Sequence, residues 1–404
     1  MPSTARRQVV SDWTPWLYGI LVVAIVALAL WIVFRRRRPL VTEDGYTKAL
    51  ELWLANDLEG ARTRFRDAID KQPDAVDPYL QLGNLLRQMG DAQRAAVLHR
   101  SLTVRQDIPR EKRVSITLSL AEDLLAIRQW QEAGEVLDSL KTIAATSARY
   151  WRARFSLWVG MGRKAEAAQA LRTASHMCDD TEGKLFKDQY AYFQVDRALR
   201  ETRGNRLGEA RRILKDIPRG SPAATKVTYV RALIAAQEGD AEKAISTATE
   251  GLLESPLEMT IFLPTLQEAL LDSGQYTRSL TILESVCQAE TAPPSLWVAL
   301  AMLYEKLDRR DDAIGLLERK ANDPRLTPNA AAPFLKLLAS EQAGSDLGRV
   351  WRALHVPTVL SAEWICSDCG AKRSDIHWFC PDCHGFNSFK VERRREGKLG
   401  ASVS

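Results

Sequence analysis

The stretch Leu80–His99, LQLGNLLRQMGDAQRAAVLH, decides the fold. It holds a small residue at Gly83, a turn residue at Gly90, a second small residue at Ala95 and a large residue, His99, four positions later. A small side chain in each of two helices lets their backbones approach closely, and the glycine between them permits a tight turn. The stretch therefore predicts a hairpin of two packed helices.

The same pattern returns eight times between residues 45 and 324. The turn residue and the small residue five positions later are Asn56/Ala61, Gly90/Ala95, Arg128/Ala133, Gly162/Ala167, Asn205/Ala210, Gly239/Ala244, Gly274/Ser279 and Asp308/Ala313. Successive small residues are 34, 38, 34, 43, 34, 35 and 34 positions apart. Twelve positions before them stand Ala49, Gly83, Ala121, Phe155, Ala198, Ala232, Gln267 and Ala301. One hairpin cannot bury its own apolar stripe, so neighbouring hairpins must stack.

This period resembles that of the tetratricopeptide repeat and predicts an all-α solenoid over residues 39–357. The two longer intervals predict loops or helix extensions near residues 105–112 and 178–188, and residues 334–354 read as a degenerate ninth unit that caps the stack. His99, in the large-residue position of its repeat, is expected to be packed rather than a ligand. Repeats of this type bind peptides or helices on their concave face. By repeat phase, the residues expected on that face are Asn84, Arg87, Arg149, Arg152 and Tyr229.

The N-terminal residues 1–38 predict a membrane anchor. Leu17–Phe34 is eighteen residues long and uncharged, and as a helix it would span about 27 Å, close to the hydrocarbon thickness of a bilayer. A cleaved signal peptide is disfavoured because Arg35, Arg36, Arg37 and Arg38 follow at once and no small-residue cleavage site does. These four arginines place the bulk of the chain on the cytoplasmic side.

The charge distribution supports this division of the chain. The formal net charge is +5, and residues 1–38 carry six arginines against one aspartate, which is also +5. Residues 39–404 therefore sum to zero, which disfavours a polyelectrolyte partner such as nucleic acid. Glycine and proline, at 22 and 17 residues, are too few for a collagen-like or wholly disordered chain.

A four-cysteine pattern marks residues 358–392. Cys366 and Cys369 form one C-x-x-C pair and Cys380 and Cys383 a second, with ten residues between the pairs. Two such knuckles predict a tetrahedral site of four thiolates, which leaves no open coordination position and so indicates a structural metal. About thirty residues cannot build a sufficient core, so the metal is expected to stabilise this module. Gly370 and Gly385 are expected to supply the strained backbone after each knuckle.

Three questions about this module stay open from the residues alone. The S₄ geometry suits iron and zinc equally. A mixed site that uses His377 or His384 is an alternative, whereas a thioredoxin-like redox pair is not, because it needs a single C-x-x-C in a βαβ context. A nucleic-acid-binding zinc ribbon is the third reading, since residues 390–398 carry five basic and two acidic residues and lead into the basic tail, residues 393–404.

The combination of anchor, eight or nine repeats and a C-terminal C-x₂-C-x₁₀-C-x₂-C module resembles the lipopolysaccharide assembly protein B family over essentially the whole chain. The rubredoxin-like segment Trp364–Asn387 is the most specific part of this likeness. The resemblance implies that the four cysteines bind one iron or zinc ion. It also implies a single-pass protein of the bacterial inner membrane that faces the cytoplasm and presents the lipid A deacetylase to an FtsH-type membrane protease, restraining lipopolysaccharide synthesis.

No catalytic signature competes with this non-enzymatic reading, because the chain has no P-loop, H-E-x-x-H, G-x-S-x-G or dinucleotide fingerprint. The alternatives are a general membrane scaffold for lipopolysaccharide assembly proteins and a metal-dependent nucleic-acid binder. The expected partners are the protease, the deacetylase and other assembly proteins, without nucleic acid. The sequence leaves a homodimer open.

Overall fold

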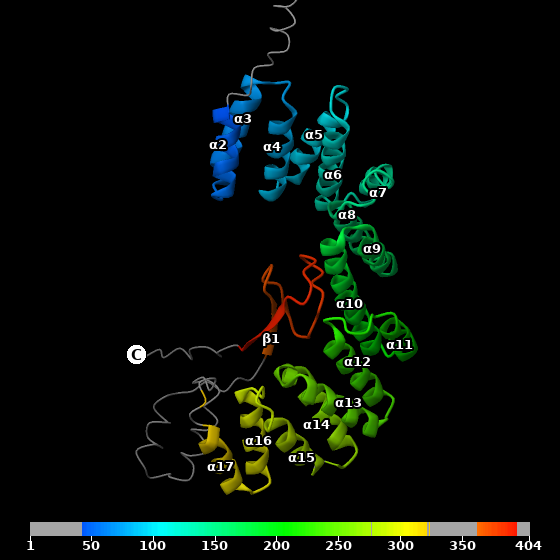
Figure 1. Cartoon of the computed structure of the whole chain (residues 1–404), viewed down its shortest axis with the longest axis vertical. Helices are drawn as coiled ribbons and strands as arrows, with labels where there is room; N and C mark the ends of the chain where they lie inside the picture. The colour runs from blue at the N-terminus through cyan, green and yellow to red at the C-terminus, as the bar shows by residue number, and fades with distance from the viewer. Residues whose placement is uncertain (1–42, 276, 321–322, 324–361, 394–404) are drawn as a thin grey trace, which may run out of the picture. The chain divides into compact units, whose positions relative to one another are not determined.

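A computed structural model describes residues 43–275, 277–320, 323 and 362–393 (Figure 1). The predicted anchor with Arg35–Arg38, the ninth unit at 334–354 and the tail from residue 394 lie outside the described residues. No helix in the described ranges combines the length and the apolar character needed to cross a membrane. The chain divides between Ala144 and Ala145 into two compact units.

The described part of the chain is mostly helical and forms eight hairpins, as the repeat pattern predicts. In the first unit the paired helices are α2 (Glu43–Leu54) and α3 (Leu58–Lys71), α4 (Val76–Gln88) and α5 (Ala92–Thr103), α6 (Arg110–Ala126) and α7 (Trp130–Ser139). In the second unit they are α8 (Ala148–Gly160) and α9 (Lys164–Met177), α10 (Asp180–Arg203) and α11 (Leu207–Lys215), α12 (Ala224–Gln237) and α13 (Ala241–Glu254), α14 (Met259–Asp272) and α15 (Arg278–Cys287), α16 (Pro294–Lys306) and α17 (Arg310–Lys320). A short 3₁₀ helix, η1 (Pro256–Glu258), precedes α14.

All eight predicted turn residues adopt the left-handed backbone conformation, with φ between 57° and 87°. Four of them are not glycine: Asn56, Arg128, Asn205 and Asp308. Each closes the first helix of its hairpin in the same way. After α4, for example, the Gly90 N–H donates to the Arg87 carbonyl and the Asp91 N–H to that of Leu86, at 3.1 and 2.8 Å. This is the Schellman arrangement, which satisfies the last carbonyls of a helix and reverses the chain.

The predicted small-residue positions are buried in seven of the eight hairpins, and most are alanines with no exposed surface. The seventh hairpin is the exception. The phase assigned to Gln267 is wrong, because its side chain is exposed and the buried face of α14 carries Leu266, Ala269 and Leu270 instead. Ser279, in α15, is only half-buried. A proline inside α14, Pro264, accompanies this irregularity.

Both long intervals are accommodated as predicted, each in a different way. Residues 104–109 form the loop between α5 and α6. The second interval lengthens a helix, since α10 runs for 24 residues from Asp180 to Arg203. The buried face of α10 also carries Phe193 and Asp196, which take part in the site described next.

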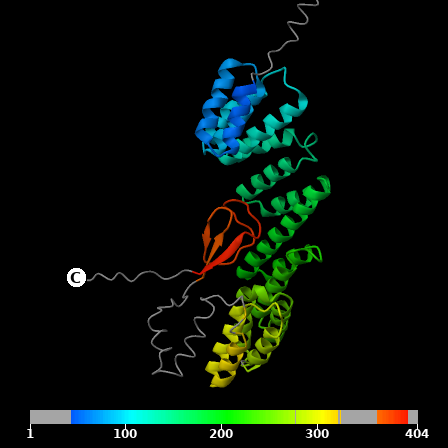
Figure 2. The same ribbon diagram turned by 60° about the vertical axis from the view of Figure 1, so that its left-hand side comes forward.

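The four-cysteine module, residues 362–393, is built on a three-stranded antiparallel sheet. The strands β1 (Ala362–Cys366), β2 (Lys372–Arg373) and β3 (Phe389–Arg393) are arranged in the order β2-β1-β3. Figures 1 and 2 show the module, in orange and red, beside the green helices α10 and α12 of the second unit. Its side chains Ile376 and Trp378 belong to the main hydrophobic core of that unit.

Candidate metal centre

Two knuckles bring the cysteines together. Strand β1 ends at Cys366, and the Gly370 N–H donates to the Cys366 carbonyl at 2.9 Å with Gly370 in the left-handed conformation. In the second knuckle His384, rather than the expected Gly385, takes the left-handed conformation, and its N–H donates to the Cys380 carbonyl at 2.9 Å. The prediction that Gly385 supplies the strained backbone of this knuckle is therefore wrong, because His384 supplies it.

Gly385 lies close to the first knuckle. A Cβ atom at this position would lie 2.3 Å from Oδ2 of Asp368, which belongs to the first knuckle, and 3.3 Å from Sγ of Cys383. A contact of 2.3 Å is far shorter than van der Waals contact. A side chain at this position would therefore require the exposed side chain of Asp368 to move.

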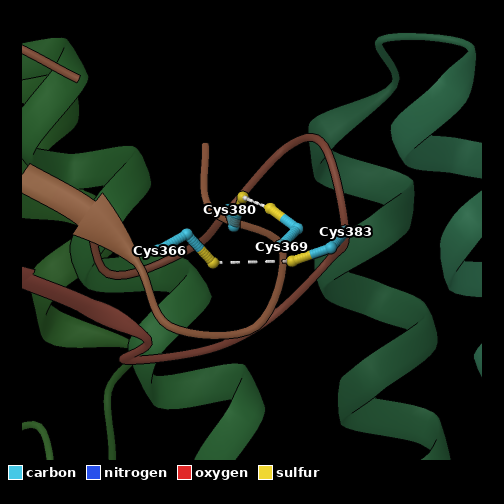
Figure 3. A group of neighbouring side chains, drawn as sticks. All are labelled: Cys366, Cys369, Cys380 and Cys383. Carbon is cyan, nitrogen blue, oxygen red and sulfur yellow. Dashed lines mark hydrogen bonds between the residues drawn. The ribbon is translucent and has the colours of Figure 1, made fainter. Parts of the chain in front are cut away.

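The four sulfur atoms converge on one point (Figure 3). Sγ of Cys366 lies 3.6 Å from Sγ of Cys383, and Sγ of Cys369 lies 3.7 Å from Sγ of Cys380. All four sulfurs are within 4.8 Å of one another. A tetrahedral ion with metal–sulfur bonds of about 2.3 Å has sulfur–sulfur distances of roughly 3.8 Å. The cluster therefore has the donor set and the dimensions for one zinc or iron ion, and neither metal is selected by them.

The electrostatics of the cluster also suit a cation. Burial opposes ionisation of Cys366, but the Ser388 hydroxyl and the backbone N–H groups of Asp368 and Cys369 lower the pKa of its thiol to about 6. Burial raises the pKa of the thiols of Cys380 and Cys383. Four thiolates packed this closely need a compensating positive charge, which a divalent ion supplies when it displaces the protons.

Aromatic side chains attach the module to the repeat helices. The Phe379 ring, 2% exposed, packs edge-on against Phe155 of α8 and Phe193 of α10, with ring centroids 5.6 and 4.9 Å away. The Trp378 ring, 3% exposed, lies edge-on to Tyr229 of α12 at 6.0 Å. Both residues immediately precede Cys380, so the second knuckle packs directly on the first helices of three hairpins.

A buried carboxylate completes this contact. Asp196 of α10 has no exposed surface; its Oδ1 accepts from the Trp378 N–H at 3.2 Å and lies 3.5 Å from Nδ1 of His377. Arg200, one helical turn further, forms an ion pair with Oδ2 of the same carboxylate. Burial opposes its ionisation, but the proximity of His377 and Arg200 lowers the pKa of Asp196 below its ordinary value. Asp196 thus joins the module to α10 as an anion.

The two histidines raised as alternative ligands face the repeats. His377 points to Asp196, and Nδ1 of His384 lies 3.0 Å from the Ser156 hydroxyl of α8. The His384 ring also stacks on Phe379 at 5.8 Å. Among the described residues, the group able to hold an ion consists of the four cysteines alone.

The residues predicted for partner binding lie in both units. Arg87 makes ion pairs with Glu122 and Asp123 at 2.8 and 2.6 Å and a hydrogen bond with the side chain of Asn84. Arg152 pairs with Glu182 at 2.6 Å, and Arg149 is half-buried. Tyr229 is covered by Trp378 of the module. Partner binding at these five residues stays a prediction.

Sequence reasoning missed the buried ionic residues. Asp196 was not singled out, nor was Asp123, whose Oδ2 lies 2.5 Å from Nδ1 of His99. His99 is fully buried, so its predicted packing is confirmed, and its Nε2 donates to the Leu80 carbonyl at 3.1 Å. The available signal was an acidic residue within the apolar face of a helix, as in Val195–Leu199, where a charge is rarely placed without a partner.

Together, the hairpins and the docked cluster define a helical repeat protein that carries a four-cysteine module on its own repeats. A family model described as tetratricopeptide repeat matches residues 296–329. The chain is similar to the lipopolysaccharide assembly protein B of Escherichia coli strain K12, with 21% identity over 395 residues that cover 93% of this chain and 98% of the relative. The proteins of the same name from E. coli O6:H1 and O157:H7 match to the same extent.

Solved structures give weaker matches. A tetratricopeptide repeat protein from Parabacteroides merdae is 13% identical, with a TM-score of 0.31 and coverage of 73% of this chain and 97% of the other. A repeat protein from Thermus thermophilus is 13% identical, with a TM-score of 0.30 and coverage of 56% and 98%. The evidence for a stack of helical hairpins is therefore the structure of this chain itself.

Proposed function

We propose that this chain is a non-enzymatic adaptor in the control of lipopolysaccharide assembly. The observation that carries the proposal is the match to lipopolysaccharide assembly protein B along 93% of this chain and 98% of the relative. An alignment of that extent concerns most of the chain rather than one repeat. Stacked helical repeats provide extended surfaces for protein partners, which suits an adaptor.

The metal has a structural role in this proposal. Cys366, Cys369, Cys380 and Cys383 would hold one zinc or iron ion, and the four thiolates would leave no position for a substrate. The second knuckle is continuous with Trp378 and Phe379, which pack on α8, α10 and α12. Loss of the ion would therefore loosen the module and uncover the inner faces of three repeat helices.

The finer proposal concerns the task of the adaptor. An anchor at residues 17–34 would hold the repeats at the cytoplasmic face of the bacterial inner membrane, with Arg35–Arg38 fixing the orientation. The adaptor would present the lipid A deacetylase to an FtsH-type protease. Confining client and protease to one membrane site raises their effective concentration without any catalysis by this chain.

The lifetime of the deacetylase in cells tests this proposal. In the native host we expect the enzyme to persist several-fold longer after translation is blocked when the chain is deleted, and to regain its normal lifetime when the chain is restored. An unchanged lifetime after deletion would overturn the presentation role. Co-purification of assembly proteins without any change in deacetylase turnover would support a general scaffold instead.

A cysteine variant connects the metal centre to this activity. Cys366→Ser/Cys369→Ser removes one knuckle, and we expect it to lose the metal and to crosslink less to its partners while it remains in the membrane fraction. Cys178→Ser is the matched control, because Cys178 is a half-buried thiol outside the cluster. Full crosslinking by the double variant would show that partner binding does not need the metal centre.

A further inference from the structure

A groove in the second unit lies away from the cysteine module. Three helices line it with residues at helical spacing. They are Arg211, Leu214 and Lys215 of α11, Arg231, Ile234 and Ala235 of α12 with Glu238 at its C-terminal cap, and Lys243 and Thr247 of α13. The groove has a volume of about 340 Å³, within the range of pockets that hold ligands.

The groove has an apolar floor and a basic rim. Leu214, Ile234 and Ala235 form the floor and are at most 4% exposed. The rim carries four cations and one carboxylate, a net charge of +3. Of these, Arg211 is held by Glu238 in an ion pair.

The other three rim cations have their charges available. Lys215, Arg231 and Lys243 are exposed, and within the described ranges their side chains make no ion pair or hydrogen bond. The other two exposed cations of α11 are paired, Arg211 with Glu238 and Arg212 with Glu209. Three unpaired cations around one apolar floor therefore form a local positive field with a hydrophobic contact at its centre.

The groove stays open when the module is docked. On α12, the Tyr229 ring contacts the Trp378 ring of the module. At 100° per residue, the three lining residues of α12 lie roughly 140° to 240° around the helix from Tyr229. The groove thus occupies the opposite face of α12 and does not compete with Trp378 for space.

We infer that this groove is a docking site for an acidic peptide segment of a partner protein, one that places carboxylates beside an aliphatic or aromatic side chain. The apolar side chain would fill the floor, and the carboxylates would pair with Lys215, Arg231 and Lys243. The distribution of the cations over three helices favours an extended segment over a compact anion. This inference is independent of the metal and of the proposed role in deacetylase turnover.

Fluorescence anisotropy of the full chain in non-ionic detergent tests the inference with a defined probe. The probe is a fluorescein-labelled peptide, EELEELEE, and the comparison peptides are EESEESEE and KKLKKLKK. We expect saturable binding of EELEELEE, at least tenfold weaker binding of EESEESEE and no binding of KKLKKLKK. Arg231→Glu/Lys243→Glu should weaken binding of EELEELEE at least tenfold, and Thr247→Trp, which fills the groove without changing its charge, should do the same.

The matched control is Arg172→Glu/Lys184→Glu, which makes the same change in net charge at two exposed cations on α9 and α10. It should leave the affinity within about twofold of the unmodified chain, and circular dichroism should show equal helix content in all variants. No binding of EELEELEE, or equal weakening by the groove and control variants, would overturn the inference. Groove-dependent binding to phosphatidylglycerol vesicles without peptide binding would overturn it in favour of a lipid surface.

Discussion

Asp196→Ala should detach the cysteine module from the repeats without unfolding either part. The carboxylate is fully buried and makes the only described hydrogen bond from the module backbone to α10, that of the Trp378 N–H at 3.2 Å. It also pairs with Arg200. Removing it leaves an unpaired N–H and a cation without its counter-ion at the contact between the module and α10.

The expected cost follows from these contacts. Breaking a buried ion pair by removing one partner costs about 3–5 kcal/mol. The Arg200 side chain is 28% exposed and can reach water, so the lower end of this range applies. About 3 kcal/mol corresponds to a roughly hundredfold increase in the detached population. Asp196→Asn keeps an acceptor for the Trp378 N–H and should cost only about 1–2 kcal/mol.

The chemical reactivity of a native histidine measures how often the module is detached from the repeats. His384 is packed between Phe155 and Phe379 when the module is docked, with centroid distances of 5.9 and 5.8 Å, whereas His176 on α9 is exposed. Diethylpyrocarbonate labelling followed by mass spectrometry gives the rate at His384 relative to the internal reference His176. We expect this ratio to rise between tenfold and a hundredfold in Asp196→Ala.

A surface ion pair of the same type serves as the control. Glu209 on α11 pairs with Arg212 at 2.6 Å, and both side chains are solvent-exposed. Exposed pairs contribute at most about 1 kcal/mol, so Glu209→Ala should leave the labelling ratio unchanged. If Asp196→Ala also leaves the ratio unchanged, the assignment of Asp196 as the link between module and repeats is refuted.

Three further outcomes are expected. Gly251→Ala should destabilise the full chain in urea unfolding by about 1–3 kcal/mol, because a Cβ there would lie 2.2 Å from the buried Phe262 ring, while Gly208→Ala, with nothing within 4 Å, should not destabilise it. The pKa of Asp196 is lowered in the folded chain. The stabilisation that its carboxylate gives the folded chain is therefore present above about pH 3.9, the pKa of an unfolded aspartate. This stabilisation is lost as the pH falls through the pKa of Asp196 in the folded chain. The gap in unfolding free energy between the unmodified chain and Asp196→Asn should therefore be smaller at pH 3 than at pH 7. Chelation of the proposed metal should speed amide exchange in residues 362–393 while the far-ultraviolet signal of the helices persists.

Local features of the fold were predictable because they recur. The turn residues Asn56 and Arg128 are chemically unlike Gly90, yet all three share φ near 60–90°, and the 34-residue spacing identified them where composition alone would not. The prediction failed at Gln267, where one hairpin departs from the common phase and the buried face of α14 shifts to neighbouring residues. A periodic pattern predicts the average repeat, so it does not reveal a single hairpin whose buried face is shifted.

Contacts between distant segments were not predictable from one sequence. The four cysteines could be grouped because their C-x-x-C spacing is itself the signal. Tyr229 and Trp378 are 149 positions apart, and nothing local in either segment indicates that one covers the other. Repeat phase placed Tyr229 toward partners, and the structure shows it against the module of its own chain.

X-ray absorption at the metal edge of the full chain, purified from its native host, tests the central claim most directly. The claim is that Cys366, Cys369, Cys380 and Cys383 hold one ion in a closed site of four thiolates. The sulfur positions predict four sulfur scatterers at about 2.3 Å and no lighter ligand in the first shell. A first shell that contains nitrogen or oxygen, or a chain that binds no metal, would contradict it.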